Sequence, residues 1–396
     1  MRKQFLFLIF AMLTGFCMCA EYALTKPTAN SVFIATYGAH FYPYVWLATI
    51  PLNLLIVGLY NRFVAKIGPL RMLTILAGFG MVINASCAHY LCQVYWLPFA
   101  FYLWKDVYIL IMLQQLWSII HATITVQRSK YLYGIIFGIG GLGSMTGSLI
   151  PSLFAIEMGS APILLFNLPL YAIVTLLYAG VVKTAGDIPT SKPDTKETNG
   201  LQLIFKSRIL QFILLIVVLM QVASSLVEYQ FNTLVEQSII DQDVRTAFYG
   251  KLWSIIHSAN LCLQFVGSFL LVKILGLRRS HILVPSLLLL NSIAFLALPT
   301  LGVMCVAYGT VKAFDYSLFA ILKEMLYVPL SSEEKFKAKA IIDVFAYRSS
   351  KALASFVVLF LQLIGFMALA WTAFALFAIW ALVAFRLKRD ETAYVT

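Results

Sequence analysis

Charged residues are scarce in this chain of 396 residues: they make up 12% of the sequence, and only 17 residues are acidic. Hydrophobic residues make up 61%, and the mean hydropathy is +0.87. Soluble domains contain about 45–50% apolar residues, so this composition excludes an ordinary soluble domain. The sequence therefore predicts an integral membrane protein.

Motifs for catalysis and metal binding are also missing. The six cysteines lie in apolar stretches without the spacing of metal ligands. The sequence contains no glycine-rich phosphate loop and no recognisable nucleophile triad. The formal net charge of +12 comes mainly from basic residues in predicted loops, which indicates membrane topology rather than nucleic-acid binding. We therefore expect no enzyme activity, no metal ion, no cofactor and no nucleic-acid partner.

Long apolar stretches recur along the whole chain. Each suits a helix of about 20 residues, the length that crosses a bilayer. Their number predicts an all-α membrane protein with twelve transmembrane helices. The predicted spans are residues 4–24, 41–63, 70–94, 96–124, 131–154, 162–182, 209–232, 249–274, 281–301, 303–328, 343–364 and 367–386.

Basic residues alternate strongly between the predicted loops. With twelve spans, 21 of the 29 lysines and arginines fall on one side, and only Lys26, Arg245 and Lys251 fall on the other. The positive-inside rule then places both termini in the cytoplasm. An alternative is that Met1–Ala20 is a cleaved secretory signal, because it has a basic start and an apolar run.

Two similar halves are predicted on either side of a polar linker, with domains at 1–182 and 209–396 and the linker at 183–208. Glu21-Tyr22 matches Glu228-Tyr229, and Lys105-Asp106 corresponds roughly to Lys312 and Asp315. Two six-helix halves resemble the major facilitator architecture. That resemblance implies a substrate site near the membrane midplane and transport by alternating access.

Charged residues inside the spans are the main candidates for function, because each costs roughly 3 kcal/mol or more at the bilayer centre. Lys105 and Asp106 diverge by about 100° on a helix, so we expect the partner of Lys105 on another helix or on a ligand. Lys312 and Asp315 are three residues apart. They form either a structural ion pair or part of a substrate or proton site.

Glu228 is the lone acid in its span, and it either carries a proton or pairs with a lysine of the other half. Arg348 and Lys351 repel each other unless an acid or an anion lies between them. A phosphate-bearing ligand suits this arrangement, and so does neutralisation by a nearby carboxylate. The candidate acids are Asp343, Asp315 and Glu324.

Glycines gather in the predicted span 131–154, with Gly140, Gly143 and Gly147 among them. Small residues let transmembrane helices approach closely. We expect tight packing against a neighbouring helix, and the alternative is a flexible gating helix.

The segment Leu322–Lys351 reads LKEMLYVPLSSEEKFKAKAIIDVFAYRSSK. It resembles the nucleotide transporter family, the ATP/ADP translocases of plastids and intracellular bacteria, a branch of the major facilitator superfamily. Two shorter runs, Ser225-Leu226-Val227-Glu228 and Gln115-Leu116-Trp117-Ser118, are similar to further motifs of that family. Its four transport-critical positions fall on Lys26, Gln115, Glu228 and Lys323, with glutamine replacing a glutamate at Gln115.

The resemblance implies a carrier that moves a nucleotide or another phosphorylated anion, including exchange of the ATP/ADP type. It also implies a monomer in a bacterial inner membrane. Two alternatives remain open: a proton-coupled facilitator of an unrelated solute, with Glu228 or Asp106 as the proton carrier, and a membrane scaffold that transports nothing. The expected anion contacts are Lys26, Lys323, Arg348 and Lys351, with Glu228 as the coupling acid and Lys105, Asp106, Lys312 and Asp315 lining the midplane.

Overall fold

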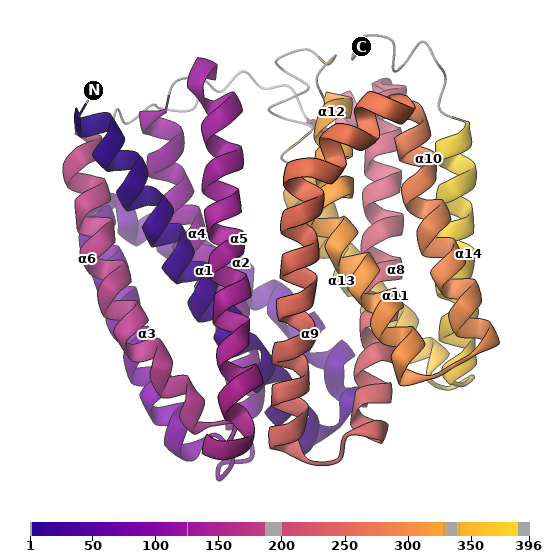
Figure 1. The fold of residues 1–396 in the computed structure, drawn as a ribbon, viewed down its shortest axis with the longest axis horizontal. Helices are drawn as coiled ribbons and strands as arrows, with labels where there is room; N and C mark the ends of the chain where they lie inside the picture. Colours follow the sequence, from indigo (N-terminus) through magenta and orange to yellow (C-terminus); the bar gives the residue numbers. More distant parts are fainter. Residues whose placement is uncertain are drawn as a thin grey trace. The chain divides into compact units, whose positions relative to one another are not determined.

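The computed structural model describes residues 2–124, 126–186, 200–327, 330, 339 and 341–386. All regular elements in these ranges are helices (Figure 1). Among them, ten are long and apolar enough to cross a membrane. The prediction of an all-helical, multi-pass membrane protein is therefore confirmed, whereas the exact number of twelve spans stays a prediction.

The two remaining predicted spans lie on less apolar or shorter helices. Residues 249–274 fall on α9 (Gln242–Cys262), on the π-helical turn η3 (Leu263–Gly267) and on the start of the next helix. Residues 343–364 fall mainly on α13 (Tyr347–Leu361), which contains a short apolar helix from Ser349 to Leu361. The polar start of α9 lowers its hydropathy.

Contacts between Cα atoms group the chain into two compact units. Unit 1 comprises Met1–Gly38, Pro51–Lys192 and Ile239–Leu261, and unit 2 comprises Ala39–Ile50, Pro193–Ser238 and Cys262–Thr396. Each unit therefore takes one segment from the opposite half of the sequence. The predicted division at 1–182, 183–208 and 209–396 stays a prediction, and residues 187–199 of the linker lie outside the described ranges.

Unit 1 is built around its first helix. α1 packs against α4, α5 and α6. It continues past Pro27 to Tyr37, whereas the sequence predicts a span that ends at residue 24. The apolar pattern resumes after Pro27, and neighbouring helices allow proline inside a transmembrane helix. The helices of unit 1 are α1 (Arg2–Tyr37), most of α2 (Tyr42–Ile67), α3 (Pro69–Tyr90), α4 (Leu97–Thr123), α5 (Val126–Met158), the 3₁₀ turn η2 (Pro162–Phe166), α6 (Asn167–Ala185) and α9.

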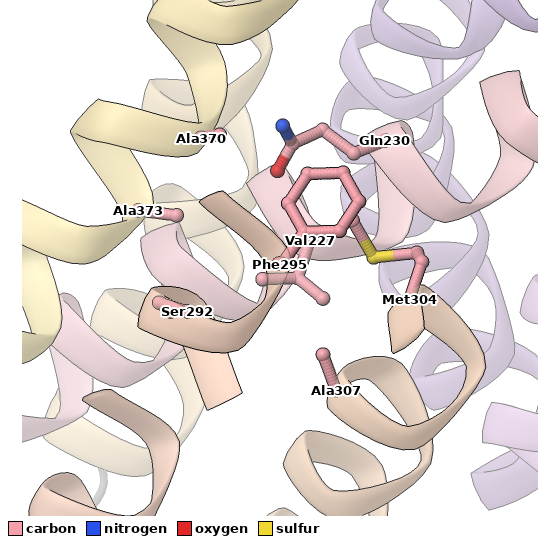
Figure 2. Close-up of a pocket in the computed structure, with 8 residues that line it drawn as sticks. All are labelled: Val227, Gln230, Ser292, Phe295, Met304, Ala307, Ala370 and Ala373. Carbon is pink, nitrogen blue, oxygen red and sulfur yellow. The ribbon is translucent and has the colours of Figure 1, made fainter. Parts of the chain in front are cut away.

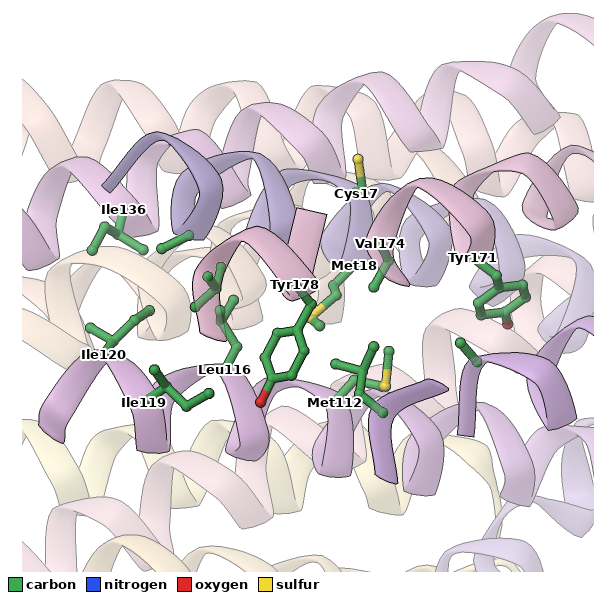
Figure 3. Close-up of a cluster of buried hydrophobic side chains, with 14 of the residues drawn as sticks. Cys17, Met18, Met112, Leu116, Ile119, Ile120, Ile136, Tyr171, Val174 and Tyr178 are labelled. Atoms are coloured by element: carbon green, nitrogen blue, oxygen red, sulfur yellow. The ribbon is translucent and has the colours of Figure 1, made fainter. Parts of the chain in front are cut away.

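The glycines of α5 let it lie directly against α1. A Cβ atom on Gly143 or Gly147 would overlap the carbonyl oxygen of Phe16 or Ala20, respectively. The prediction of tight packing is confirmed. A cluster of buried apolar side chains from α1, α3, α4, α5 and α6 forms the core beside this contact (Figure 3).

Unit 2 is built around α8 (Arg208–Ser238), which packs against α11, α13 and α14. Three π-helical turns lie among the described residues of unit 2: η3 follows α9, η4 (Asp315–Phe319) separates α11 from α12, and η6 (Ile341–Ala346) precedes α13. Such turns are rare and often mark functional sites. The other helices of unit 2 are α7 (Gly200–Lys206), α10 (Ser268–Ala297), α11 (Leu301–Phe314), α12 (Ala320–Tyr327) and α14 (Phe366–Phe385), together with the short turn η1 (Ala39–Phe41).

Candidate substrate-binding site

A buried ion pair joins two helices of unit 2. The ammonium of Lys312 on α11 lies 2.8 Å from Oε2 of Glu228 on α8 and donates to Oγ of Ser224 at 3.1 Å. Both charged side chains are only 10% exposed. Glu228 therefore pairs with a lysine of its own unit, a partner that the sequence analysis did not expect, and its alternative role as a proton carrier stays a prediction.

Asp315 lies at the start of the π-helical turn η4, three residues after Lys312. It accepts a hydrogen bond of 3.0 Å from Nε2 of Gln221 on α8. The alternative that these residues belong to a substrate or proton site stays a prediction, whereas within the described residues no ion pair joins Lys312 to Asp315, so the alternative of a structural ion pair is wrong. The prediction assumed α-helical spacing, which ends at Phe314.

Lys323 on α12 completes what we call the charged cluster of unit 2, namely Glu228, Lys312, Asp315 and Lys323. Asp315 lies within electrostatic range of both lysines. Lys323 itself is half-buried. The cluster contains two acids and two bases, so it is formally neutral as a group.

Lys105 and Asp106 form an ion pair in unit 1, with 2.8 Å between Nζ and Oδ1. The expectation that adjacent residues cannot pair is wrong, because the flexible four-carbon stem of lysine bends back to its neighbour. The hydroxyl of Tyr22 donates to the same Oδ1 at 3.1 Å. The ammonium also lies 3.7 Å from the ring centroid of Tyr102.

Two candidate lysines rest on tryptophan rings. Lys26 of α1 lies 3.4 Å from the ring centroid of Trp253 on α9, within unit 1. Lys351 of α13 lies 5.0 Å from that of Trp46 on α2, within unit 2. Both lysines are half-buried. Each position favours a cation, because the face of an indole ring carries negative charge.

The predicted partnership of Arg348 and Lys351 is only partly described, because the side chains of Arg348 and Asp343 lie outside the described residues. Glu324 pairs instead with Lys339 at 2.6 Å, and Asp315 is engaged by Gln221. Across the described part of the chain, Lys351 therefore has no carboxylate within ion-pair distance.

Gln115, which stands where the family resemblance implies a glutamate, is buried in unit 1. Its amide nitrogen donates to the carbonyl oxygen of Pro69. Gln115 therefore links α4 to the start of α3, a structural contact that a carboxylate could not make with a carbonyl oxygen.

A further group of buried polar residues surrounds Glu21 of α1, and the sequence analysis did not single this group out. Glu21 is buried, and its Oε1 accepts hydrogen bonds from the hydroxyls of Tyr171 at 2.7 Å and Thr25 at 3.0 Å. Asn84 donates to the Tyr171 hydroxyl at 2.7 Å, and Asn167 donates to the Thr25 hydroxyl at 2.8 Å. In the sequence, the match between Glu21-Tyr22 and Glu228-Tyr229 was the signal that could have identified Glu21 as a candidate.

A small pocket lies among α8, α10, α11 and α14 of unit 2 (Figure 2). Its walls are mostly apolar and carry no charge, so it does not suit a phosphorylated ligand. The lining residues are Val227, Gln230, Ser292, Phe295, Met304, Ala307, Ala370 and Ala373. In the described ranges, no group of three or more His, Cys, Asp or Glu side chains could hold a metal ion.

Residues 300–389 match the family model described as the TLC ATP/ADP transporter. The chain is 26% identical to ADP,ATP carrier protein 1 of Chlamydia muridarum over 215 residues, which is 49% of this chain and 40% of that protein. It is 25% identical to the plastidic ATP/ADP-transporter of Solanum tuberosum over 173 residues, covering 39% and 27% of the two chains. The chain thus spans less than half the length of these relatives. The resemblance inferred from the sequence motifs is confirmed.

The fold is similar to those of two solved transporters. The nucleoside transporter NupG superposes with a TM-score of 0.63 at 15% identity, covering 96% of this chain and 98% of that one. A bacterial homologue of the iron transporter ferroportin superposes with a TM-score of 0.63 at 13% identity, covering 97% and 98%. At these identities the similarity concerns the fold alone.

Proposed function

We propose that this chain, with its TLC ATP/ADP transporter region at residues 300–389, is a membrane carrier of nucleotides. It moves a nucleotide or a related phosphorylated anion by alternating access, and ATP/ADP exchange is the preferred form. One observation carries the proposal: the matched region contains Lys312, Lys323 and Lys351, three half-buried or buried cations on α11, α12 and α13 of unit 2.

The chemistry of these side chains suits a phosphate group. A phosphate carries several negative charges, and lysine binds it as a compact point charge with three donors. Glu228 and Asp315 balance two cations of the charged cluster, while Lys351 adds positive charge that the described carboxylates do not offset. We propose that Lys323 and Lys351 contact the phosphates and that Arg348 assists them.

The roles of the other candidates follow from their contacts. Glu228 fixes Lys312 and keeps α8 against α11, so it acts as a pairing acid. Lys26 supplies a cation of unit 1 that Trp253 holds in place. Lys105 and Asp106 form a pair that contributes polarity without net charge. We further propose twelve spans, a monomer, cytoplasmic termini and a bacterial inner membrane.

A ligand panel on the purified protein tests the substrate class. We expect nucleotides at a hundred times their dissociation constant to stabilise the fold by about 2.7 kcal/mol, measured as an increase in melting temperature. Lys323→Ala should abolish the increase. Lys66→Ala, which removes an exposed lysine of α2, is the matched control and should keep it.

An exchange assay in liposomes tests the transport reaction itself. Vesicles loaded with ADP should take up labelled ATP, and empty vesicles should take up far less. Lys323→Ala and Lys351→Ala should reduce the exchange, whereas Lys66→Ala should not. No response to any nucleotide in either assay would refute the proposed function, and a response to free nucleosides alone would move the substrate class away from phosphates.

A further inference from the structure

Several residues of the two halves of the chain are identical at a constant offset of 207 residues. Glu21-Tyr22 and Glu228-Tyr229 are 207 residues apart, and so are Lys105 and Lys312. Gly68 (φ 87°) and Gly276 (φ 75°) both have a positive φ, and they lie 208 residues apart, one residue more than this offset. Further identical pairs at this offset are Phe41 and Phe248, Tyr42 and Tyr249, Trp46 and Trp253, Arg71 and Arg278, and Asn84 and Asn291.

This offset makes Glu21 the equivalent of Glu228 and Lys105 the equivalent of Lys312. Glu228 and Lys312 form an ion pair in unit 2. In unit 1, Lys105 pairs with Asp106 instead. Across the described residues Glu21 makes no ion pair, and its partners are two hydroxyl groups. A buried charge without a counter-ion is costly, so this carboxyl group requires an explanation.

The hydroxyls that contact Glu21 are themselves held in position. Asn84 bonds the Tyr171 hydroxyl, and the amide nitrogen of Asn167 bonds both the Thr25 hydroxyl and Oδ1 of Asn84. The network links α1, α3 and α6, and its five residues are at most 4% exposed. The hydrogen bonds of the network measure 2.7–3.0 Å between heavy atoms.

Few ionisable groups lie near Glu21. Its own helix and the packed helices bring Cys19, Tyr108 and Tyr171 within electrostatic range. On α4, Asp106 forms an ion pair with the ammonium of Lys105.

The other helices of unit 1 bring few charged groups towards this region. On α9, Trp253 and His257 lie close to Lys26. α3 contributes the uncharged Asn84, and α5 contributes Gly147, which packs on Ala20.

We propose that Glu21 is a proton-binding site that couples transport to a proton gradient. The carboxylate takes up one proton from water on one side of the membrane, becomes a neutral carboxylic acid, and returns the proton to water on the other side. Tyr171 and Thr25 stabilise the carboxylate when the proton has left, because each donates to it. The coupling rests on the proposed function, whereas the protonation of Glu21 does not.

Infrared difference spectroscopy on the purified full chain tests the site without any substrate. As the pH falls, every carboxylate that takes up a proton gains the carbonyl band of a carboxylic acid, so the component of Glu21 is taken from the difference between the wild-type and Glu21→Gln spectra. We expect this difference to show one carboxylic-acid component, which Glu157→Gln, the same change at an exposed site of unit 1, should keep. Tyr171→Phe retains the carboxyl group and should shift the pH midpoint of that component. Identical carbonyl bands in the wild type and Glu21→Gln overturn the proposal.

Uptake into liposomes tests the coupling. A gradient of one pH unit is worth a factor of about ten in accumulation for each proton carried, so wild-type nucleotide uptake should respond strongly. In Glu21→Gln the ratio of uptake with and without the gradient should fall to one. Wild-type uptake that ignores the pH gradient, or that responds to a Na⁺ gradient instead, overturns the coupling. If the wild type transports no nucleotide, the proposed function fails, and the infrared titration still decides the proton site.

Discussion

Units 1 and 2 carry a glutamate and a lysine at equivalent positions but pair them differently. In unit 2, Lys312 reaches Glu228, and the residue after it is Ala313. In unit 1, the residue after Lys105 is Asp106, which takes the ammonium. This difference leads to the hypothesis that the acids competing for a cation decide its partner as much as the spacing does. In unit 1, Glu21 accepts hydrogen bonds from two hydroxyl groups instead.

The two pairs also differ in exposure. The side chains of Lys312 and Glu228 are each 10% exposed, whereas Asp106 is 22% exposed beside the 2% of Lys105. Removing one member of a buried pair is costly because the other charge remains without compensation. The pair of unit 2 should therefore matter more for stability than the pair of unit 1.

Lys312→Met should cause the largest loss, because it leaves the buried carboxylate of Glu228 without its cation. We expect a destabilisation of about 3–5 kcal/mol, measured as a fall in the melting temperature of the detergent-purified protein. The double variant Lys312→Met with Glu228→Gln removes both charges and should recover most of the loss. A single variant that melts with the wild type would mean that the pair does not stabilise unit 2.

Asp106→Ala tests whether the competing acid decides the pairing in unit 1. Without Asp106, Lys105 should turn to Glu21 and reproduce the arrangement of unit 2. A double-mutant cycle between Asp106→Ala and Glu21→Gln should then give a coupling energy of about 0.5–3 kcal/mol. The converse change, Ala313→Asp, should weaken the coupling between Lys312 and Glu228. Additive effects in both cycles would show that the neighbouring acid is irrelevant.

The tryptophans at equivalent positions allow a finer comparison. Lys26 lies 3.4 Å from the Trp253 ring, and Lys351 lies 5.0 Å from the Trp46 ring. Cation–π contacts are worth roughly 0.5–2 kcal/mol. Trp253→Leu should therefore raise the KM for nucleotide several-fold, whereas Trp46→Leu should raise it about twofold. Trp253→Phe keeps an aromatic face and should fall between Trp253→Leu and the wild type; equal KM values would contradict the role of the rings.

Much of the fold could be predicted from the sequence, because apolar stretches of about 20 residues are a strong signal for membrane helices. Ten of the predicted spans correspond to helices of suitable length. The end of α1 was missed because Thr25, Lys26 and Pro27 look like a loop, and only packing with neighbouring helices keeps them helical. The π-helical turn at Asp315 gives no sequence signal, which explains the wrong pairing predicted for Lys312.

The candidate site was predictable as a set of residues but not as a set of contacts. Charged residues within spans identified Glu228, Lys312 and Lys105 correctly as buried groups. Their partners depend on rotamers and on residues far away in the sequence. Glu21 was missed because neither of its partners carries a charge: Thr25 is four residues away, and Tyr171 on α6 is 150 residues away in the chain.

The smallest effect is expected at the exposed pair of Glu324 and Lys339, which serves as the reference for the buried pairs. Their side chains are 49% and 37% exposed, and the ion pair spans 2.6 Å. Water and salt screen such a pair, so Lys339→Ala should cost about 0–1 kcal/mol. The loss should vanish at 1 M salt, where the screening length is about 3 Å, whereas the effect of Lys312→Met should persist. A large, salt-resistant loss in Lys339→Ala would mean that this pair is buried in the membrane-embedded protein, and the ranking of the two pairs would then reverse.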